Sequence, residues 1–517
     1  FIGSESGRTN TTGTSNVFLG MQAGYTNNGH YNSFIGFSTG KYNTTGSYNY
    51  FYGYNAGFSN TTGNNNVFLG NESGHSNTTT SNNVFLGYYA GYSNSADNNL
   101  FLGTEAGRLN TTGTGNAFLG YLAGQANLTG SSNIFIGNQS GLKNSTGSSN
   151  VFMGEMAGGY NLTGTSNIFI GTQSGGSNTT GYFNVFLGKG AGYSNTTGIA
   201  NVFIGSDAGW YNIGGTYPQG SSNIFIGQFA GRYNTIGSGN SYLGDGAGYT
   251  MIAGTKNVFI GQSAGNLQSA GLSNTYIGSN AGASKTAGDY NAFLGGYAGS
   301  SNTTGGQNVF LGYNAGGGNT GTGSVFIGFS AGTSIAGSSK LAIENSSAII
   351  PLIGGDFATD RVGINRMPTT YTLEVGGTIW ANGSAIVAGS AVWSDVRYKT
   401  EITQLSGALE DILKLQGVRY NWRQSEFPEL NFPKGEQIGV IAQDLEKILP
   451  QLVYTGPDGY KSVSYEKLTP VLIEAIKEQQ NQIESTKQVN LQLKRELEEL
   501  KTLVNRLIAN KTVQGNK

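Results

Sequence analysis

The chain has 517 residues, of which 85 are glycine, and only 11% carry a charge. The near balance of 28 basic and 29 acidic residues excludes the basic surface that a nucleic-acid-binding protein needs. The absence of cysteine excludes disulfide scaffolds, cysteine-ligated metal centres and thiol nucleophiles. No run of about 18 apolar residues predicts a membrane span, and we expect neither a metal nor a cofactor.

Residues 1–332 contain about twenty copies of one unit, Asn-x-Phe-Leu/Ile-Gly, with a usual spacing of 17 residues. The aromatic residue is phenylalanine except at Tyr242 and Tyr276, and one copy carries an insertion around Tyr217 and Pro218. A second glycine follows four residues after the first, and many copies close with Asn-Thr-Thr-Gly. Because the chain begins at Phe1 inside a copy, we expect a further N-terminal portion to precede it.

The repeat length and the glycines predict a mainly β fold, a β-solenoid rod with one or two short strands per coil. Seventeen residues are too few for a useful helical hairpin, and glycine with Asn-Thr-Thr-Gly is turn chemistry. The regular period argues against the disordered linker that a glycine-rich, weakly charged composition would otherwise suggest. At about 4.8 Å per coil, twenty coils would form a rod about 95 Å long.

Each predicted strand is apolar at consecutive positions, as in Val17, Phe18 and Leu19, so both of its faces favour burial. One face can fill the interior of the coil, and the other needs a cover. We expect another copy of the chain to supply it; the alternative is a wide monomeric solenoid that folds both faces inside. These coils, with Asn-x-x-Ile-Gly followed by Ala/Ser-Gly, resemble the left-handed β-roll heads of trimeric autotransporter adhesins, whose repeats are shorter.

Residues 333–393 lose the 17-residue period but keep short β patterns at 340–344, 361–365 and 371–375, and they are predicted to form a β stalk. The composition then changes: 34 of the 57 charged residues, but only seven glycines, lie in residues 394–517. A helical pattern at 439–450 and a strand pattern at 461–465 predict a small α+β domain over residues 394–470.

A heptad pattern begins at Leu472 and predicts a trimeric coiled coil within residues 471–517. The alternative is a single amphipathic helix that lies on its own domain. The two core positions of the heptad are occupied by Ile476, Ile483, Asn490, Leu497 and Val504, and by Leu472, Gln479, Thr486, Leu493, Leu500 and Leu507.

Three motifs, at 394–399, 439–446 and 465–479, closely resemble the intramolecular chaperone of phage endosialidase tail spikes, which is shared by many tail fibres and by myelin regulatory factor. The resemblance implies a domain that trimerises, guides folding of the preceding β fibre and then releases itself by autoproteolysis. It places the cleaved bond between Trp393 and Ser394, with Ser394 as nucleophile and Lys399 as base. Many family members have asparagine two residues after the lysine, where this chain has Glu401.

Elementary chemistry sets conditions for such a pair. The Ser394 hydroxyl reaches the Trp393 carbonyl carbon through a five-membered ring, so intramolecularity supplies much of the catalysis. Lys399 accepts the proton only as a neutral amine, which requires a water-poor pocket. A five-residue offset on a regular helix separates two side chains by about 140°, so the pair needs a turn or a neighbouring subunit. Asp395 and Arg397 are supporting residues, either as a salt bridge that orders the turn or in catalysis.

The sequence therefore predicts a homotrimeric extracellular fibre, carried by a phage tail or a bacterial surface, that binds a cell-surface receptor or glycan. A glycan-degrading spike is a weaker alternative because it needs paired carboxylates. An ice-binding solenoid is another, but its threonine corners are interrupted at Leu128, Leu162 and Ile236. Calcium-binding β-rolls use repeated aspartates, which this chain lacks. The acidic residues of 1–332 are few and scattered between copies: Glu5, Glu72, Asp97, Glu105, Glu155, Asp207, Asp245 and Asp289.

Overall fold

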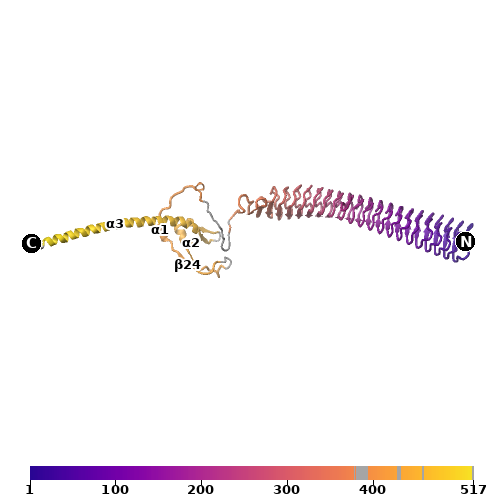
Figure 1. Ribbon diagram of the computed structural model, residues 1–517, viewed down its shortest axis with the longest axis horizontal. Helices are drawn as coiled ribbons and strands as arrows, with labels where there is room; N and C mark the ends of the chain where they lie inside the picture. Colours follow the sequence, from indigo (N-terminus) through magenta and orange to yellow (C-terminus); the bar gives the residue numbers. More distant parts are fainter. Residues whose placement is uncertain (378, 380–393, 428–431, 457–458, 515–517) are drawn as a thin grey trace. The chain divides into compact units, whose positions relative to one another are not determined.

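The computed structural model describes residues 1–377, 379, 394–427, 432–456 and 459–514. They belong to two compact units, Phe1–Thr378 and Ile379–Lys517, which are traced in Figure 1.

The first unit is a β-solenoid with one three-residue strand per coil, as the repeat predicted. Consecutive strands pair in parallel and in register, so that Phe68 lies opposite Phe85. The first copy contributes only an isolated bridge between Ile2 and Leu19. The strands are β1 Val17–Leu19, β2 Ser33–Ile35, β3 Tyr50–Tyr52, β4 Val67–Leu69, β5 Val84–Leu86, β6 Leu100–Leu102, β7 Ala117–Leu119, β8 Ile134–Ile136, β9 Val151–Met153, β10 Ile168–Ile170, β11 Val185–Leu187, β12 Val202–Ile204, β13 Ile224–Ile226, β14 Ser241–Leu243, β15 Val258–Ile260, β16 Thr275–Ile277, β17 Ala292–Leu294, β18 Val309–Leu311 and β19 Val325–Ile327.

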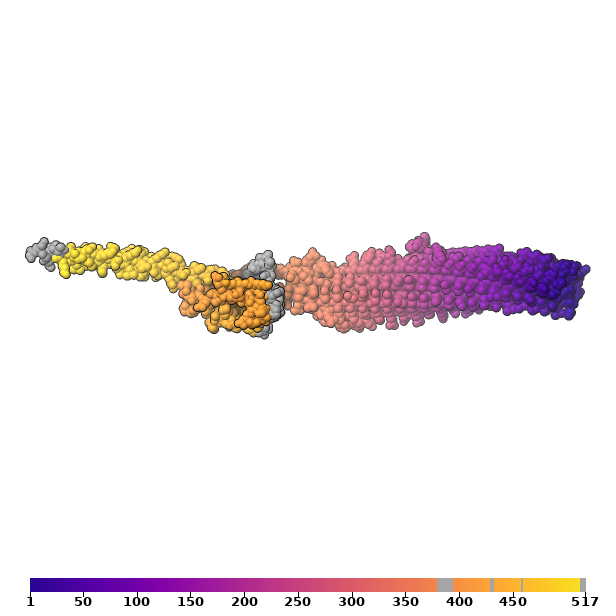
Figure 2. Space-filling view, turned by 90° about the horizontal axis from the view of Figure 1, so that it is seen from below, coloured from indigo at the N-terminus to yellow at the C-terminus, as the bar shows by residue number. Residues whose placement is uncertain are grey.

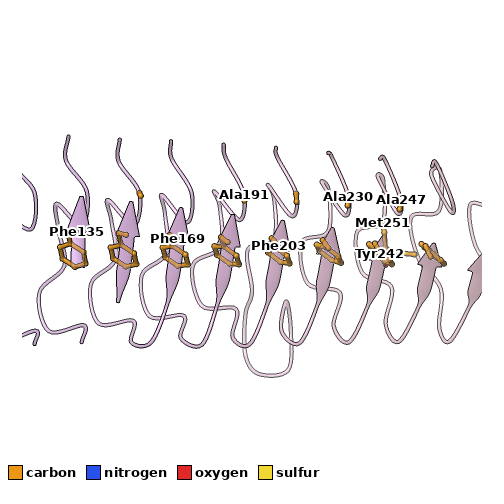
Figure 3. Packing of buried hydrophobic residues seen from close by; sticks show 14 of the residues in the cluster. Phe135, Phe169, Ala191, Phe203, Ala230, Tyr242, Ala247 and Met251 are labelled. Carbon is orange, nitrogen blue, oxygen red and sulfur yellow. The ribbon is translucent and has the colours of Figure 1, made fainter. Parts of the chain in front are cut away.

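A single column of aromatic rings forms the core of the solenoid (Figure 3). The rings of Phe68 and Phe85 are stacked with centroids 4.8 Å apart and planes at 6°, which is the spacing of adjacent strands. The side chains on either side of each ring face outward and are half-buried or exposed. One strand face therefore fills the coil, as expected. The single chain does not fold both faces inside.

Steric constraints explain why two positions of each coil are glycine. Gly20 has φ +135°, and a Cβ there would overlap the carbonyl of Gly36 in the next coil. Gly24 has φ +59°, and a Cβ there would lie 2.7 Å from the ring of Phe18. The first glycine permits close stacking of coils, and the second leaves room for the aromatic column.

Two columns of buried asparagines complete the interior. In the first, the backbone N–H of Asn66 donates to Oδ1 of Asn49 at 3.0 Å, one coil away. In the second, Nδ2 of Asn161 donates to Oδ1 of Asn144 at 2.7 Å and to the carbonyl of Gly164 at 3.0 Å. The asparagine of Asn-Thr-Thr-Gly, which we expected as a corner residue, is thus an interior residue that links coils.

The second asparagine column is interrupted at Met251, Gln268 and Lys285. The buried Lys285 ammonium donates to Oδ1 of Asn302 at 2.6 Å and to the carbonyl of Gly305. Burial lowers the pKa of Lys285 to about 8, although the nearby Asp289 carboxylate opposes the shift. The solenoid therefore carries a charged group at a position where most coils have the neutral amide of asparagine.

Past the repeats, the sheet continues through β20 (Lys340–Ile343), β21 (Ile353–Asp356), β22 (Arg361–Ile364) and β23 (Leu373–Val375). Strand β20 pairs in parallel with β19, and β21 then pairs antiparallel with β20 and β22. The three predicted β patterns are confirmed, whereas β21 was not predicted because its two glycines are typical of a turn.

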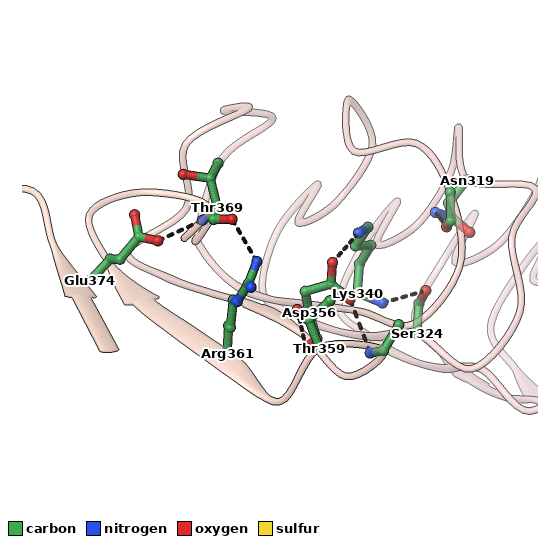
Figure 4. A network of polar contacts seen from close by, with 10 residues as sticks. Asn319, Ser324, Lys340, Asp356, Thr359, Arg361, Thr369 and Glu374 are labelled. Carbon is green, nitrogen blue, oxygen red and sulfur yellow. Dashed lines mark hydrogen bonds and ion pairs between the residues drawn. The ribbon is translucent and has the colours of Figure 1, made fainter. Parts of the chain in front are cut away.

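Ion pairs and backbone hydrogen bonds hold this end of the sheet together (Figure 4). Lys340 Nζ lies 2.8 Å from a carboxylate oxygen of Asp356. The Glu374 carboxylate accepts backbone N–H bonds from Thr370, Tyr371 and Thr369, which lower its pKa to about 2.

The second unit combines small sheets with helices. Its strands pair antiparallel as β24 with β25 and β26 with β27. Its core consists of Ala408, Leu445, Leu449, Leu452, Val471 and Ala475. Its elements are η1 Val396–Tyr398, α1 Ala408–Lys414, β24 Val418–Tyr420, β25 Gln437–Gly439, α2 Ala442–Ile448, η3 Pro450–Leu452, β26 Val453–Thr455, β27 Lys461–Val463, η4 Tyr465–Lys467 and α3 Leu468–Gln514.

Helix α2 is shorter than the helix predicted over residues 439–450. Gly439 ends strand β25, and the next backbone N–H, of Val440, donates to the Tyr465 hydroxyl at 3.0 Å. Because both groups are engaged outside a helix, α2 begins at Ala442 and ends at Ile448. The predicted strand at 461–465 is confirmed over Lys461–Val463, and a 3-10 turn begins at Tyr465.

Helix α3 is 47 residues long and contains the whole heptad pattern. Its first turns pack against α1 through Val471 and Ala475, whereas the heptad leucines beyond them are exposed, as at Leu497 (54% exposed). The helix is therefore confirmed, and the coiled coil stays a prediction. In the described part of the chain, no helix is both long and apolar enough to cross a membrane.

Candidate active site

Ser394 and Lys399 are in direct contact. The Lys399 ammonium donates a hydrogen bond of 2.8 Å to Oγ of Ser394. Between them lies the three-residue 3-10 turn η1, and the backbone is extended both at Asp395 before it (φ −64°, ψ 132°) and at Lys399 after it (φ −117°, ψ 140°). The extended residues on both sides of this short turn, rather than its helical period, bring together two side chains that a continuous α-helix would separate. The sequence had indicated that the pair needs a turn or a neighbouring subunit, and the contact here is made within one chain.

Asp395 and Arg397 order the turn. Oδ1 of Asp395 accepts the backbone N–H of Arg397 at 2.9 Å and thereby caps η1. The Arg397 guanidinium also pairs with the Asp395 carboxylate, at 2.6 Å between Nη2 and Oδ2. This hydrogen-bonded pairing, together with the backbone contact, lowers the pKa of Asp395. The contacts are those of the turn-ordering role, one of the two roles expected for these residues.

The serine–lysine pair is open to solvent in the single chain. Both residues are exposed, and so is Glu401, which follows the turn with φ +55°. Within the described residues, no ion pair joins Glu401 to Lys399. Trp393 lies outside the described residues, and with it the carbonyl of the predicted cleavage bond. The described residues therefore do not enclose Lys399 in a water-poor pocket.

One contact in this unit was missed by the sequence interpretation. The Glu478 carboxylate, on α3, accepts the backbone N–H groups of Ala408 at 3.2 Å and Leu409 at 2.8 Å. Gly407, which precedes helix α1, has no side chain to cap the helix, so Glu478 supplies the cap from a distance. The missing local cap is the signal that could have indicated such a partner.

Two acidic residues of the solenoid pair with an arginine three residues further along the chain. Glu5 pairs with Arg8 at 2.8 Å, and Glu105 pairs with Arg108 at 3.0 Å. Across the described ranges, no group of three or more metal-ligating side chains forms a metal site.

The threonine corners bind coil to coil. The hydroxyl of Thr44 donates to the carbonyl of Thr61 at 3.0 Å, and the hydroxyl of Thr61 donates in the same way to Thr78. The hydroxyl protons of these two threonines are therefore engaged in hydrogen bonds between neighbouring coils. Leu128, Leu162 and Ile236 interrupt the same corners with exposed apolar side chains, so the corners do not form a regular threonine lattice.

Together these observations define a class: a repetitive β-solenoid rod followed by a small α+β domain that opens with a serine–lysine pair and ends in a long helix. Residues 394–454 match the model of a peptidase family described as chaperone of endosialidase. The C-terminal region therefore carries an intramolecular chaperone domain of the endosialidase type, as the motifs indicated. The rod and this domain fit a phage tail spike or fibre. Neither a curated protein nor a solved structure matches the chain.

Proposed function

We propose that three copies of this chain form an extracellular fibre, as part of a phage tail or a bacterial surface, and that the C-terminal domain assembles the fibre and then cuts itself off. Residues 1–332 form the rod, 333–393 the stalk, 394–470 the chaperone and 471–517 the coiled coil. The observation that carries the proposal is the hydrogen bond between Ser394 and Lys399 at the first residue of the matched domain.

Cleavage proceeds between Trp393 and Ser394 in one turnover. Ser394 Oγ attacks the Trp393 carbonyl carbon while neutral Lys399 takes the hydroxyl proton. The C–N bond breaks, the proton passes to the released amine of Ser394, and an ester joins Trp393 to Oγ. Water then hydrolyses the ester and leaves a carboxylate on Trp393 and a free hydroxyl on Ser394. Lys399 is exposed in the single chain, so neighbouring subunits supply the water-poor surroundings that favour its neutral form.

Trimerisation is supported by apolar groups that the single chain leaves uncovered. The heptad leucines of α3, such as Leu493 and Leu497, are exposed along most of the helix. Burying each such side chain contributes about 1.5–3 kcal/mol. A three-stranded coiled coil would cover them and hold three C-termini together.

The chaperone role follows from the repeat itself. Nearly identical coils allow chains to associate one coil out of register, and glycine-rich chain loses much backbone entropy when it becomes ordered. Joining the C-termini raises the local concentration of the chains and sets their starting register. Once the domain is released, the fibre keeps no nucleus for reassembly, so its stability becomes kinetic. The mature fibre presents its surface to a cell-surface receptor or glycan.

The test is a denaturing gel of the expressed chain. A fragment that ends at Trp393 should appear, whereas Ser394→Ala and Lys399→Ala should each leave the chain whole. Glu401→Asn, which restores the residue common in the family, should cleave at least as fast as the natural chain. Folded, soluble chain that stays intact in both the natural and the Glu401→Asn form would refute the dyad. Soluble trimers from a chain ended at residue 393 would refute the chaperone role.

A further inference from the structure

The strands of the solenoid present an apolar strip on their outward face. In β10, Ile168 and Ile170 lie on either side of buried Phe169, and they are 39% and 37% exposed. The residue after the core ring is Leu, Ile, Met or Tyr in every strand from β1 to β19. The residue before the ring is apolar or tyrosine in all of these strands except three, which have Ser33, Ser241 and Thr275. We call these two columns of residues the outward strip, and neither column contains a charged residue in β1 to β19.

The edges of the outward strip are free of protruding side chains. The residue before each strand is a buried asparagine in most coils, as at Asn66, and the residue after each strand is glycine, as at Gly70. The position after this glycine, by comparison, varies among aromatic, polar and charged residues, as in Tyr54, Asn71 and Lys189. A flat partner can therefore approach the outward strip closely along both edges.

Variation in coil length does not interrupt the outward strip. The longest coil has 22 residues between Gly205 and Gly227, yet Val202 still lies opposite Ile224 in the paired strands β12 and β13. Its extra residues, at 213–220, lie outside both strands. The strip therefore continues from coil to coil along one long, narrow body (Figure 2).

The size of the outward strip is that of a subunit interface. At about 4.8 Å per strand, nineteen strands extend over about 90 Å, and three residues across a strand measure about 10 Å. The strip thus covers about 900 Å² on each chain. The largest apolar patch on a typical monomeric protein covers about 300–600 Å², whereas each partner in a stable complex buries about 800 Å².

We propose that the outward strips of three copies face one another around a common axis, and that this contact holds the rods together after the C-terminal domain is released. The inference rests on the proposed self-releasing trimer and assigns its lasting contact. Cleavage after Trp393 removes the heptads of α3, so the contact that keeps the fibre together then lies within residues 1–393. It joins coils whose ring column is already complete within each chain.

A second copy of the chain matches the outward strip better than a membrane does. The strip of the copy has the same period of about 4.8 Å over the same length, so every outward pair of side chains meets an equivalent pair. Chains joined at their C-termini run in parallel, which brings strips of equal length together. The strip has none of the lysine, arginine and tryptophan residues that anchor a protein surface to lipid headgroups.

The first test is thiol crosslinking, for which the chain is suited because it contains no cysteine. Ile170→Cys places one thiol on the outward strip, and Thr180→Cys, the control, places one at an exposed corner of the same coil. After treatment with a short bismaleimide, the full chain and its cleaved product are compared on a denaturing gel. Ile170→Cys should give several-fold more crosslinked dimer than Thr180→Cys in both.

A second test places charge on the same surface. The double variant Ile136→Asp, Ile170→Asp puts carboxylates on the outward strip of two coils, and the control Thr146→Asp, Thr180→Asp puts them at exposed corners of the same two coils. In sedimentation, the cleaved rods of the first variant should separate at a lower urea concentration than those of the control. Equal behaviour of the two variants would overturn the proposed interface.

Other outcomes separate this interface from the wider proposal. Intact trimers without crosslinking at position 170 would overturn the interface and leave the trimeric fibre. Cleaved chains that sediment as monomers would overturn both the interface and the trimeric fibre, while self-cleavage stands. Monomers that float with vesicles of neutral phosphatidylcholine would show that the outward strip contacts a membrane, and the proposal would be wrong.

Discussion

The solenoid and the C-terminal unit bury their apolar groups in opposite ways. Phe169, in the middle of the solenoid, is fully buried by its own chain, because the rings of neighbouring coils cover it. Leu497, in the middle of α3, is 54% exposed, because nothing in the described chain covers it. The solenoid core is thus complete within one chain, whereas the heptad residues of α3 have no packing partner in the described chain. The need for partners is concentrated in the tail.

This difference refines what the rod requires from other copies. Its outward residues, such as Ile168 and Ile170, remain partly exposed, so a partner could cover that face. The aromatic column does not depend on such a partner. In the proposed trimer, assembly would therefore have to choose the register of nearly identical coils rather than supply their core.

The largest effect, on oligomeric state, is expected at the core positions of the heptads in α3, which form the seam of the proposed coiled coil. Leu497→Asp places a charge in the core of the coiled coil, so sedimentation at micromolar concentration should show monomers in place of trimers. Leu491→Asp is the control, because Leu491 lies outside the seam and is 52% exposed in the single chain. Equal behaviour of the two variants would mean that the heptad pattern does not direct assembly.

Within the solenoid, alanine substitutions at two neighbouring residues of one strand should change the free energy of unfolding by very different amounts. Phe169→Ala opens a cavity in the ring column and should lower the free energy of unfolding by about 3–5 kcal/mol. Ile168→Ala, on the outward face, should lower it by less than about 1 kcal/mol if that face stays in water. Urea unfolding measures both. A loss above 2 kcal/mol for Ile168→Ala would show that another chain covers this face.

Lys285, the charged residue that interrupts the second asparagine column, predicts that the stability of the solenoid depends on pH. The pKa of Lys285 falls from 10.5 in the unfolded chain to about 8 in the solenoid, so between these values the unfolded state holds the extra proton. Stability should therefore rise as the pH increases from 8 to 10.5. Lys285→Asn should stabilise the coil at pH 7 and remove this slope in thermal unfolding. Lys256→Asn, at an exposed lysine, should change neither.

The smallest effect is expected at the far end of the sheet. The pKa of Glu374 is about 2 because its carboxylate accepts three backbone N–H groups, so its stabilising contribution is present above pH 4.5 and lost as the pH falls through 2. In Glu374→Gln the amides of Thr369, Thr370 and Tyr371 should exchange with deuterium several-fold faster at pH 6. Unchanged exchange would contradict the role of these bonds.

The elements that could be predicted from the sequence are those whose residues repeat at a fixed interval. The 17-residue spacing placed the strands and the ring column, and the heptads placed α3, because both patterns record burial at fixed intervals. For Ser394 and Lys399 the sequence left a turn and a neighbouring subunit as alternatives, because a regular α-helix separates side chains five residues apart, and the structure has the turn.

The parts that were missed depend on partners distant in sequence. Asn-Thr-Thr-Gly is a sequence typical of a turn. Its asparagine nevertheless lies in the interior, where it forms hydrogen bonds with the asparagine of the neighbouring coil. Helix α2 starts late because the Tyr465 hydroxyl holds the N–H of Val440. The cap that Glu478 provides for α1 spans about seventy residues of chain. None of these contacts has a local sequence pattern.

The single file of rings has a consequence for the evolution of the fibre. Since each ring of the column stacks only on the rings of the preceding and following coils, a coil can be gained or lost without repacking the rest. The reach of the fibre can therefore change in steps of about 4.8 Å while the tail that assembles it stays the same.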